Sequence, residues 1–379
     1  MDDAEFKAWH RLAHTPGLSR TAARALLRAA GSAQEAAQLD AGQVGTLAGA
    51  RAAQAWEAAA GPAAQARLLA AQRWREAPGR HVRVLGAEGY PGWLLNAPDP
   101  PLLLYVLGDA TLLGPGIADN RCLAVVGSRQ PTPAGRAHAR AFAQAFAQAG
   151  VTVVSGLAVG VDASAHEGAL EGGGPTLAVI GTGPDLVYPS RHRELAARIA
   201  AQGAIVSEYP PGTPSRAEHF PQRNRIIAGL ARGTLVVEAA LQSGSLITAR
   251  LAAEAGREVF ALPGSIDSAQ SRGCHALIRQ GALLVETASE VLAELGWAPW
   301  PPETAPAQAG APARGGLPAA AAGAGIVLEA LGFEPTDLDT LARRTGLPGA
   351  ELAARLLELE LEGRVSRMPG GLFQRCGRA

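Results

Sequence analysis

The middle of the chain alternates short, continuously apolar runs with longer stretches of helical periodicity. The apolar runs occur in "LLLYVLGD", "RCLAVVGS", "VTVVSG", "TLAVIG", "AIVSE", "GTLVVEA" and "EVFALPG". Between two of them, Phe142 and Phe146 lie four residues apart on one helical face, and Gly150 follows. Strands that are apolar throughout are buried on both faces, which is typical of a parallel sheet covered by helices. The pattern predicts an α/β fold over residues 80–297, with a Rossmann-like, doubly wound and mostly parallel sheet.

The two ends of the chain have helical patterns of their own. Residues 1–75 are rich in Ala, Leu and Arg, with a turn at Pro16-Gly17 and a helical run that ends at Gly31. This segment predicts a small SAM-like or helix-hairpin-helix domain, which serves either to touch a DNA backbone or to bind another protein. Residues 326–379 are expected to form three helices and a hairpin, the arrangement of a winged-helix domain.

A compositional break separates the sheet domain from the winged helix. Residues 298–325 are dominated by Pro, Ala and Gly and show no apolar period, so they predict a flexible linker. The third helix of the predicted winged helix, "GAELAARLLELELEG", carries several glutamates and a single arginine. Such a helix reads a DNA groove poorly, and a partner-binding role for this domain is the better expectation.

Composition narrows the classes of function. The 379 residues are 47% hydrophobic, which is ample for buried cores, and the 34 basic and 34 acidic residues cancel. Any contact with nucleic acid must therefore rest on a local patch rather than on a global basic field. Neither a membrane span nor a signal-peptide pattern is evident, so a cytoplasmic protein is expected. Cys122, Cys274 and Cys376 are too far apart for a disulfide framework or zinc-ligand spacing, and no metal or cofactor is predicted.

Every predicted strand of the middle region ends in small or polar residues. Because the carboxyl ends of parallel strands open on one edge of a sheet, these residues are expected to lie together, with glycines and helix amides available to an anion. Thr132 and Pro133 fit the cap and first position of the helix that follows the first loop. The strand ends are Gly127-Ser128-Arg129, Ser155-Gly156, Gly181-Thr182-Gly183, Ser207-Glu208, and Glu238 leading to Ser243-Gly244-Ser245.

The stretch "FPQRNRIIAGLA" concentrates phosphate-binding chemistry. Asn224 stands between Arg223 and Arg225, and a guanidinium fork grips phosphate through two hydrogen bonds. Phe220, just ahead of them, is placed to stack a base. The alternative is that Arg223 or Arg225 pairs with Glu208 or Glu238 and holds the sheet edge together.

These stretches, with "SGLAVGVDASAHEGAL", "GTGPDLVYPSRHREL", "VVEAALQSGSLITARLAAEAGREVFALPG" and "GCHALIRQGA", resemble the DprA/Smf family of DNA-processing proteins. They cover most of residues 95–295 in the family's order. The resemblance implies a single-stranded DNA-binding protein that protects incoming strands in natural transformation and loads a RecA-type recombinase onto them. It also implies a homodimer formed through the Rossmann-like domain, and no catalytic activity.

Two sets of site residues follow. The predicted single-strand contacts come from the strand-end loops, from the arginine-rich stretch, and from "SGSLITAR", where many members carry lysine in place of Arg250. They are Gly127, Ser128, Arg129, Ser155, Gly156, Phe220, Arg223, Asn224, Arg225, Ser243, Gly244, Ser245 and Arg250. Near the end of the sheet domain, "CHALIRQGALLV" predicts a helix and an edge strand whose apolar faces require a packing partner. The resemblance implies that the family dimerises through the same region. The predicted dimer contacts are His275, Leu277, Ile278 and Leu284.

An enzymatic alternative is a Rossmann-type phosphoribohydrolase that cleaves nucleotides. Asp162 and His166, four residues apart on one helix, could form an acid–base pair, and Glu208 and Glu238 could act as paired carboxylates. The simpler roles are a helix cap for Asp162, and packing or a phosphate contact for His166. The "PGGxGTxxE" loop of those hydrolases is absent, and the first loop, "GSRQPT", is not a dinucleotide-binding G-x-G-x-x-G, so binding is favoured over catalysis.

Overall fold

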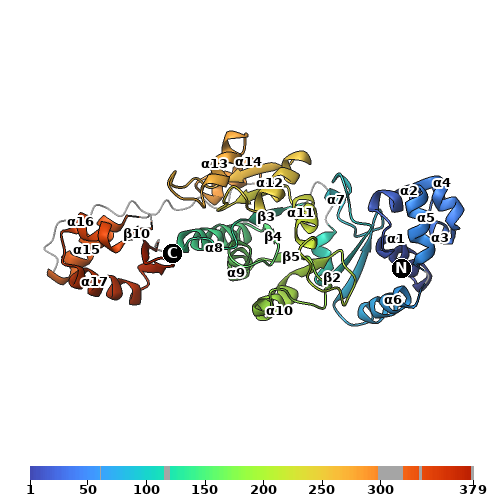
Figure 1. Cartoon of the computed structure of the whole chain (residues 1–379), viewed down its shortest axis with the longest axis horizontal. Coiled ribbons are helices and arrows are strands. Elements are labelled where there is room, and N and C mark those ends of the chain that lie inside the picture. Colours follow the sequence, from blue (N-terminus) through green and yellow to red (C-terminus); the bar gives the residue numbers. More distant parts are fainter. Residues whose placement is uncertain (60, 115–119, 298–318, 333–334, 377–379) are drawn as a thin grey trace.

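The computed structural model describes residues 1–59, 61–114, 120–297, 319–332 and 335–376. At its centre lies a nine-stranded sheet in the order β1-β2-β6-β5-β4-β3-β7-β8-β9. Its strands are β1 (Arg80–Val84), β2 (Leu103–Gly108), β3 (Cys122–Val126), β4 (Thr152–Ser155), β5 (Thr176–Ile180), β6 (Ala204–Ser207), β7 (Gly233–Val236), β8 (Glu258–Ala261) and β9 (Leu283–Leu284). Figure 1 shows the sheet between two helical regions.

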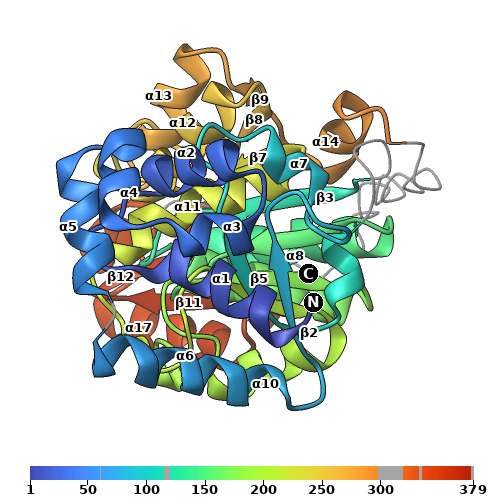
Figure 2. The same ribbon diagram turned by 90° about the vertical axis from the view of Figure 1, so that its right-hand side faces the viewer.

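Neighbouring strands from β6 across to β9 run parallel, which confirms the expected mostly parallel, doubly wound fold. At the opposite edge β2 pairs antiparallel with β6, and β1 pairs antiparallel with β2. The strand order reverses beside β3, since β4, β5 and β6 extend to one side and β7, β8 and β9 to the other. The short strand β9 closes the sheet next to β8, close to α12 and α13 (Figure 2).

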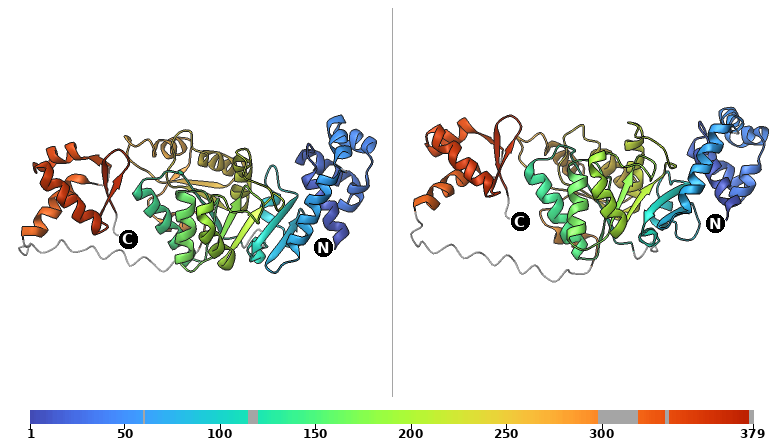
Figure 3. Two further views of the ribbon diagram at one scale, coloured as in Figure 1. Left: turned by 60° about the horizontal axis from the view of Figure 1, so that its bottom comes forward. Right: turned by 90° about the horizontal axis from the view of Figure 1, so that it is seen from below.

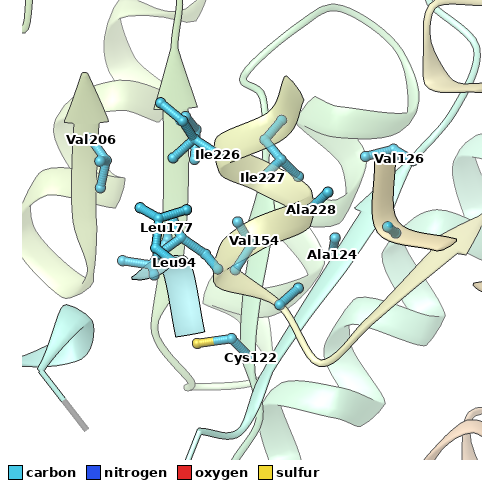
Figure 4. Close-up of a cluster of buried hydrophobic side chains, with 14 of the residues drawn as sticks. Leu94, Cys122, Ala124, Val126, Val154, Leu177, Val206, Ile226, Ile227 and Ala228 are labelled. Carbon is cyan, nitrogen blue, oxygen red and sulfur yellow. The ribbon is translucent and has the colours of Figure 1, made fainter. Parts of the chain in front are cut away.

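Helices cover both faces of the sheet. Alternate residues of β3 pack into the hydrophobic cores on opposite faces of the sheet. Leu123 and Val125 belong to one core, and Ala124 and Val126 belong to the other. One face packs against α8 (Pro133–Gln148), α9 (Val161–Glu171), α10 (Arg193–Gln202) and α14 (Ala288–Glu294). The other face packs against α7 (Gly92–Leu95), α11 (His219–Leu230), α12 (Ser245–Glu254) and α13 (Arg272–Arg279). Figure 4 shows Ile226, Ile227 and Ala228 of α11 among the strand residues of that core.

The first helices pack onto the antiparallel edge of the sheet. They are α1 (Asp3–His14), α2 (Arg20–Ala30), α3 (Ala33–Gln38), α4 (Ala41–Ala48), α5 (Ala50–Ala58) and α6 (Pro62–Arg75). Their core includes Phe6, Leu26 and Trp56 and continues into Leu103 and Tyr105 of β2. Figure 3 shows these helices, in blue, beside the first strands of the sheet. Helix α2 ends at Gly31 with a φ of 86°, as its sequence predicts. The antiparallel edge strands are therefore covered by these helices rather than exposed.

The carboxyl-terminal region forms the predicted winged helix. It contains α15 (Ala319–Leu331), β10 (Thr336–Asp337), α16 (Leu338–Thr345), α17 (Gly349–Leu361), β11 (Val365–Met368) and β12 (Leu372–Arg375). The strands form an antiparallel sheet in the order β10-β12-β11. Asp337 caps α16 by accepting a hydrogen bond from the Thr340 amide at 2.7 Å, and Gly346 ends the helix in a left-handed conformation.

The expected linker, residues 298–325, differs from the structure at its end. Residues 298–318 lie outside the described part of the chain, but α15 already begins at Ala319. The reason is local propensity, because residues 319–322 are four consecutive alanines, the strongest helix formers. Within the described residues, no helix is both long enough and apolar enough to span a lipid bilayer.

Candidate functional site

A cavity of about 410 Å³ lies at the carboxyl ends of β3 and β7. These two strands are neighbours on either side of the point where the strand order reverses, which is where open α/β sheets bind their ligands. We call this cavity the switch-point pocket. It is lined by Val126, Gly127, Ser128, Arg129, Gln130, Ala158, Asp162, Arg223, Asn224, Ile227, Ala240, Gln242, Ser243, Gly244, Ser245, Thr248 and Gln270.

The loop after β3 forms one wall of the pocket and has no room for a side chain at Gly127. A Cβ atom at this position would lie 2.7 Å from Cγ2 of Val161 and 2.9 Å from the carbonyl oxygen of Glu238. The Ser128 amide donates to that same carbonyl at 2.6 Å, and the Ser128 hydroxyl accepts from the Gln130 amide at 3.0 Å. The loop is thus fixed by its own turn and by a hydrogen bond to the chain after β7, before any ligand arrives.

The carboxylate of Glu238 occupies the start of α8. Its oxygens accept hydrogen bonds from the Thr132 amide at 2.9 Å and the Thr132 hydroxyl at 2.6 Å. The Thr132 hydroxyl in turn accepts from the Gly135 amide at 3.0 Å, which confirms Thr132 as the helix cap. A carboxylate at a helix N-terminus is stabilised by the helix dipole, so Glu238 has a structural role here and pairs with neither predicted arginine.

The start of α12 forms the opposite wall and is open. Gly244 precedes the helix without a side-chain cap, and its first turn carries no acidic residue. The hydroxyl oxygens of Ser243 and Ser245 lie 2.7 Å apart at this end. The Leu246 and Ile247 amides donate to the carbonyls of Ser243 and Gly244 at 3.1 Å and 3.2 Å. The positive end of the helix dipole and the two hydroxyls, rather than free amides, therefore favour an anion such as a phosphate here.

Arg223 lies on the floor of the pocket and is 4% exposed. Its Nε donates to Oδ1 of Asn224 at 3.0 Å, its Nη1 donates to the carbonyl of Val179, and its Nη2 lies 3.9 Å from Oδ2 of Asp162. Burial lowers its pKa to about 10, against the opposing charge of Asp162. Asn224 also donates to the carbonyl of Gly244 at 3.2 Å, which ties α11 to the start of α12. Arg223 therefore supplies positive charge from a fixed position.

Ser155 and Gly156 lie beneath the pocket rather than along it. The Ser155 hydroxyl donates to the carbonyl of Val125 at 2.7 Å and is fully buried. A Cβ atom on Gly156 would collide with the guanidinium of Arg223, so the glycine makes room for that side chain. The Gly156 amide donates to Asp162 at 3.2 Å. Both predicted contacts thus support the floor of the pocket instead of facing into it.

Arg129 is exposed at the rim, beside two aromatic rings. Its guanidinium carbon lies 5.6 Å from the ring centroid of Phe220, and that ring lies 5.5 Å from the ring of Tyr188. Tyr188 is 51% exposed. We call Arg129, Phe220 and Tyr188 the aromatic shelf. It is adjacent to a cationic pocket and offers ring faces on which bases can stack.

Arg225 lies away from the pocket, in a cluster of charges that we call the ion-pair hub: Arg20, Arg24, Asp99, Glu208 and Arg225. Its Nη2 donates to the carboxylate of Glu208, and its Nε lies 3.3 Å from Asp99. Arg20 and Arg24 of α2 each approach Asp99 at 2.6 Å. The pairing alternative is confirmed for Arg225 with Glu208. The other hub partners of Arg225 had no sequence signal, because Asp99 and α2 are distant from α11 in the chain.

Arg250 lines a neighbouring groove between α12 and α13, of about 580 Å³, and lies 3.5 Å from Glu254. Of the predicted dimer residues, Leu277 lines the same groove. Nε2 of His275 lies 3.0 Å from the carbonyl oxygen of Gly264, Leu277 is buried in the chain's own core, and Ile278 packs partly against that core. Leu284, on the edge strand β9, is 51% exposed.

Asp162 and His166 do not contact each other as an acid–base pair. Nε2 of His166 accepts a hydrogen bond from the Leu157 amide at 3.3 Å, and its Nδ1 lies 2.7 Å from the Thr176 hydroxyl, which itself donates to a carbonyl. The imidazole is fully buried, and burial, followed by the charge of Arg223, lowers its pKa to about 3. Burial raises the pKa of Asp162, whose carboxylate accepts from the Gly156 and Ala158 amides. His166 has the packing role that was its simpler alternative.

Several pocket residues were missed by the sequence reasoning. Gln130 and Gln242 lie within the quoted motifs, and Thr248 is one helical turn after Ser245, so the motifs themselves carried a usable signal. Gln270 carried none, because it reaches the pocket from the loop after β8. Among the described residues, no group of three or more His, Cys, Asp or Glu side chains is arranged to hold a metal ion.

Two family models match the chain. Residues 81–296 match the model of DNA recombination-mediator protein A, and residues 311–371 match the DprA winged helix domain. The first match contains every residue of the switch-point pocket. The second contains most of the winged helix.

Individual relatives agree with the family models. The chain is 44% identical to protein Smf of Escherichia coli over 79% of its own length and 78% of the relative. The X-ray structure of DNA processing protein A from Streptococcus pneumoniae covers 78% of this chain and 98% of its own, with 35% identity and a TM-score of 0.67. DNA processing protein A from Helicobacter pylori, described for its single-stranded DNA binding mode, covers 57% of this chain and 95% of its own, with 30% identity and a TM-score of 0.51. The chain therefore belongs to the DprA/Smf family of DNA recombination-mediator proteins.

Proposed function

We propose that the chain binds single-stranded DNA in the switch-point pocket, protects incoming strands in natural transformation and loads a RecA-type recombinase onto them. The observation that carries the proposal is the convergence of three features on one pocket: the open start of α12, the exposed Arg129 and the fixed charge of Arg223. Together they supply the positive end of a helix dipole and two guanidinium groups to a phosphate.

A strand fits these features better than a single nucleotide does. The aromatic shelf lies outside the pocket and next to it, so a base can stack there while a neighbouring phosphate occupies the pocket. The carboxylates considered for catalysis have internal partners, since Glu238 binds Thr132, Glu208 binds Arg225, and Asp162 accepts backbone amides. These contacts support binding rather than nucleotide cleavage.

The partners follow from family membership and from the sheet edge. Recombinase loading rests on membership in a recombination-mediator family. A homodimer through the Rossmann-like domain is supported by β9, an edge strand on which Leu283 is 37% and Leu284 is 51% exposed. Exposed leucines on an unpaired strand edge are stabilised by pairing with a second copy.

A titration of fluorescent oligonucleotides tests the proposed function. Affinity should be higher for single strands than for duplexes and should rise with strand length, because added phosphates release more counterions and added bases stack. Arg129→Ala should weaken binding of every sequence by about 1 kcal/mol or more, and reduce the log–log salt slope by about one.

Arg198→Ala is the matched control, because Arg198 is exposed on α10 and does not line the pocket. Its affinity should equal that of the wild type. Equal affinity of wild type and Arg129→Ala would remove the pocket from the proposal. Release of free base from a nucleoside monophosphate would favour the phosphoribohydrolase alternative instead.

Light scattering tests the dimer. Leu284→Arg places a charge on the exposed edge of β9 and should give a folded monomer with an unchanged circular dichroism spectrum, because the side chain is not part of the chain's own core. Leu69→Arg, at a leucine of α6 that is 45% exposed, should leave the dimer intact. A dimer that persists in Leu284→Arg would place the interface elsewhere.

A further inference from the structure

A second cavity, of about 310 Å³, lies within the first helices, between α1 and the start of α6. From α1 it is lined by Lys7, His10, Arg11 and His14, and from α6 and the residues before it by Gly61, Ala64, Gln65 and Arg67, among others. It lies outside the residues matched by either family model. We call it the α1–α6 cavity.

The charged residues lining the α1–α6 cavity are all cationic. Lys7, the only lysine of the chain, is exposed at its mouth, and Arg67 is half-buried. Arg11 is held in place, since its Nη1 donates to the carbonyl of Ala37 at 3.0 Å and its guanidinium lies 4.0 Å from the ring centroid of Trp56. Among the described residues that line the cavity there is no aspartate or glutamate. Three like charges around one cavity repel each other, and a bound anion relieves that repulsion.

The start of α6 places the positive end of a helix dipole at the same cavity. The helix runs for 14 residues from Pro62, Gly61 precedes it without a side-chain cap, and its first turn has no acidic residue. Its positive dipole end is therefore not neutralised by the chain itself, unlike the start of α8, where Glu238 is bound.

His10 provides an independent sign that a charge is missing. Its ring is 5% exposed, and its Nε2 has no hydrogen-bond partner. Burial, and then the charge of Arg67, lowers its pKa to about 4. The next imidazole along α1, His14, lies 4.8 Å away between ring centroids, and its Nε2 lies 3.1 Å from the Tyr105 hydroxyl. Both histidines are thus neutral beside uncompensated cations.

We propose that the α1–α6 cavity binds a phosphate group, held by Lys7 and Arg67 at the positive end of the α6 dipole. The volume exceeds what a carboxylate needs and accommodates a phosphate with part of an attached sugar. The phosphate is either the monoester of a free nucleotide or a diester of a nucleic-acid backbone, since both present the same oxygens to these donors.

The test uses the full chain carrying Arg129→Ala, so that the switch-point pocket contributes little. Calorimetry measures the binding of pyrophosphate, thymidine monophosphate and the dinucleotide thymidylyl-thymidine. Arg67→Gln and Lys7→Gln should each weaken binding of the preferred probe, by about tenfold for Arg67→Gln. Tighter binding of the monophosphate identifies a free nucleotide as the ligand, and tighter binding of the dinucleotide identifies a nucleic-acid backbone.

Two controls accompany the titration. Arg51→Gln removes an exposed arginine of α5 outside the cavity and should bind like its parent. Arg67→Lys keeps the charge and should retain most of the affinity, which provides a measurement if Arg67→Gln folds poorly. The pKa of His10, followed by NMR, should rise when pyrophosphate is added, because the anion offsets the charge of Arg67. Three results would each overturn the proposal. None of the three probes binds, or the Arg67→Gln and Lys7→Gln variants bind the probe as tightly as their Arg129→Ala parent, or the pKa of His10 is unchanged at saturation.

Discussion

The switch-point pocket and the ion-pair hub use arginines of one helix in opposite ways. Arg223 and Arg225 are two positions apart on α11, and both were predicted to contact DNA. In the hub three guanidinium groups share the carboxylates of Asp99 and Glu208, so two of the three positive charges are compensated within the chain. In the pocket Arg223 faces Asp162 alone, and Arg129 forms no ion pair among the described residues. One arginine-rich motif thus contains both an arginine that we propose for strand binding and an arginine that joins parts of the fold.

The largest expected effect separates a pocket arginine that supports the fold from one that does not. Arg223→Ala leaves Asp162 buried without its counter-charge and should lower the free energy of unfolding by about 3–5 kcal/mol. Arg129→Ala should change the unfolding free energy by less than about 0.5 kcal/mol, because its side chain is exposed. Urea denaturation of both variants measures the difference. Similar unfolding free energies would mean that Arg223 does not anchor the floor of the pocket.

The hub should show an intermediate effect and a pH signature. Asp99→Asn removes the carboxylate that Arg20, Arg24 and Arg225 share, and should cost about 1–3 kcal/mol, with faster proteolysis of α2. Strand binding should stay close to wild type, because none of these residues lines the pocket. A large loss of strand affinity in a folded Asp99→Asn protein would erase the distinction between the two regions.

Protonation of Asp99 at low pH should destabilise the hub in the same way as the Asp99→Asn substitution. Burial raises the pKa of Asp99, but the charge of Arg225 and hydrogen bonds from Arg24 and Arg20 outweigh burial, and the pKa lies below its usual value. The stabilisation is therefore fully present above the unfolded pKa, roughly pH 4, and is lost as the pH falls through the lower folded value. Unfolding free energies of the wild type should fall more steeply below about pH 4 than those of Asp99→Asn.

The smallest effect concerns Arg250, which was predicted from sequence to contact the strand. It faces the groove between α12 and α13, and its partner is Glu254 on the same helix. Arg250→Ala should cost about 0.2–0.5 kcal/mol of stability and weaken strand binding less than Arg129→Ala does. Parallel titrations of the two variants at one salt concentration give the ranking. A loss as large as that of Arg129→Ala would extend the binding surface from the pocket to this groove.

The parallel sheet and its loop edge could be predicted because they depend on local pattern. Runs such as "LAVVG" and "TLAVIG" are apolar almost throughout, and small or polar residues follow each of them. The same short stretch of sequence therefore indicates the strand, its parallel direction and the loop at its carboxyl end. Capping residues such as Thr132 and Asp337 are read equally locally. The α-helical start of residues 319–325 was missed because a linker composition outweighed a short alanine run.

The role of each arginine could not be predicted, because it depends on contacts between distant segments. Arg225 meets Asp99, which lies well over a hundred residues earlier, and Arg223 meets the carbonyl of Val179 through a space that Gly156 leaves open. The motif shows that arginines are present, but the tertiary contacts determine which of them is paired within the chain and which can contact a ligand.

Glu238 accepts hydrogen bonds through both its backbone carbonyl and its carboxylate, and this has a consequence for the kinetics of binding. Its carbonyl holds the Ser128 amide and its carboxylate holds Thr132, so the loop after β3 is tethered to the chain after β7 at two points. Both walls of the pocket are pre-organised, and a strand that enters pays little conformational entropy to order them. Association should then be limited by diffusion and electrostatic steering rather than by loop closure, and hydrogen exchange of these loops should change little on binding.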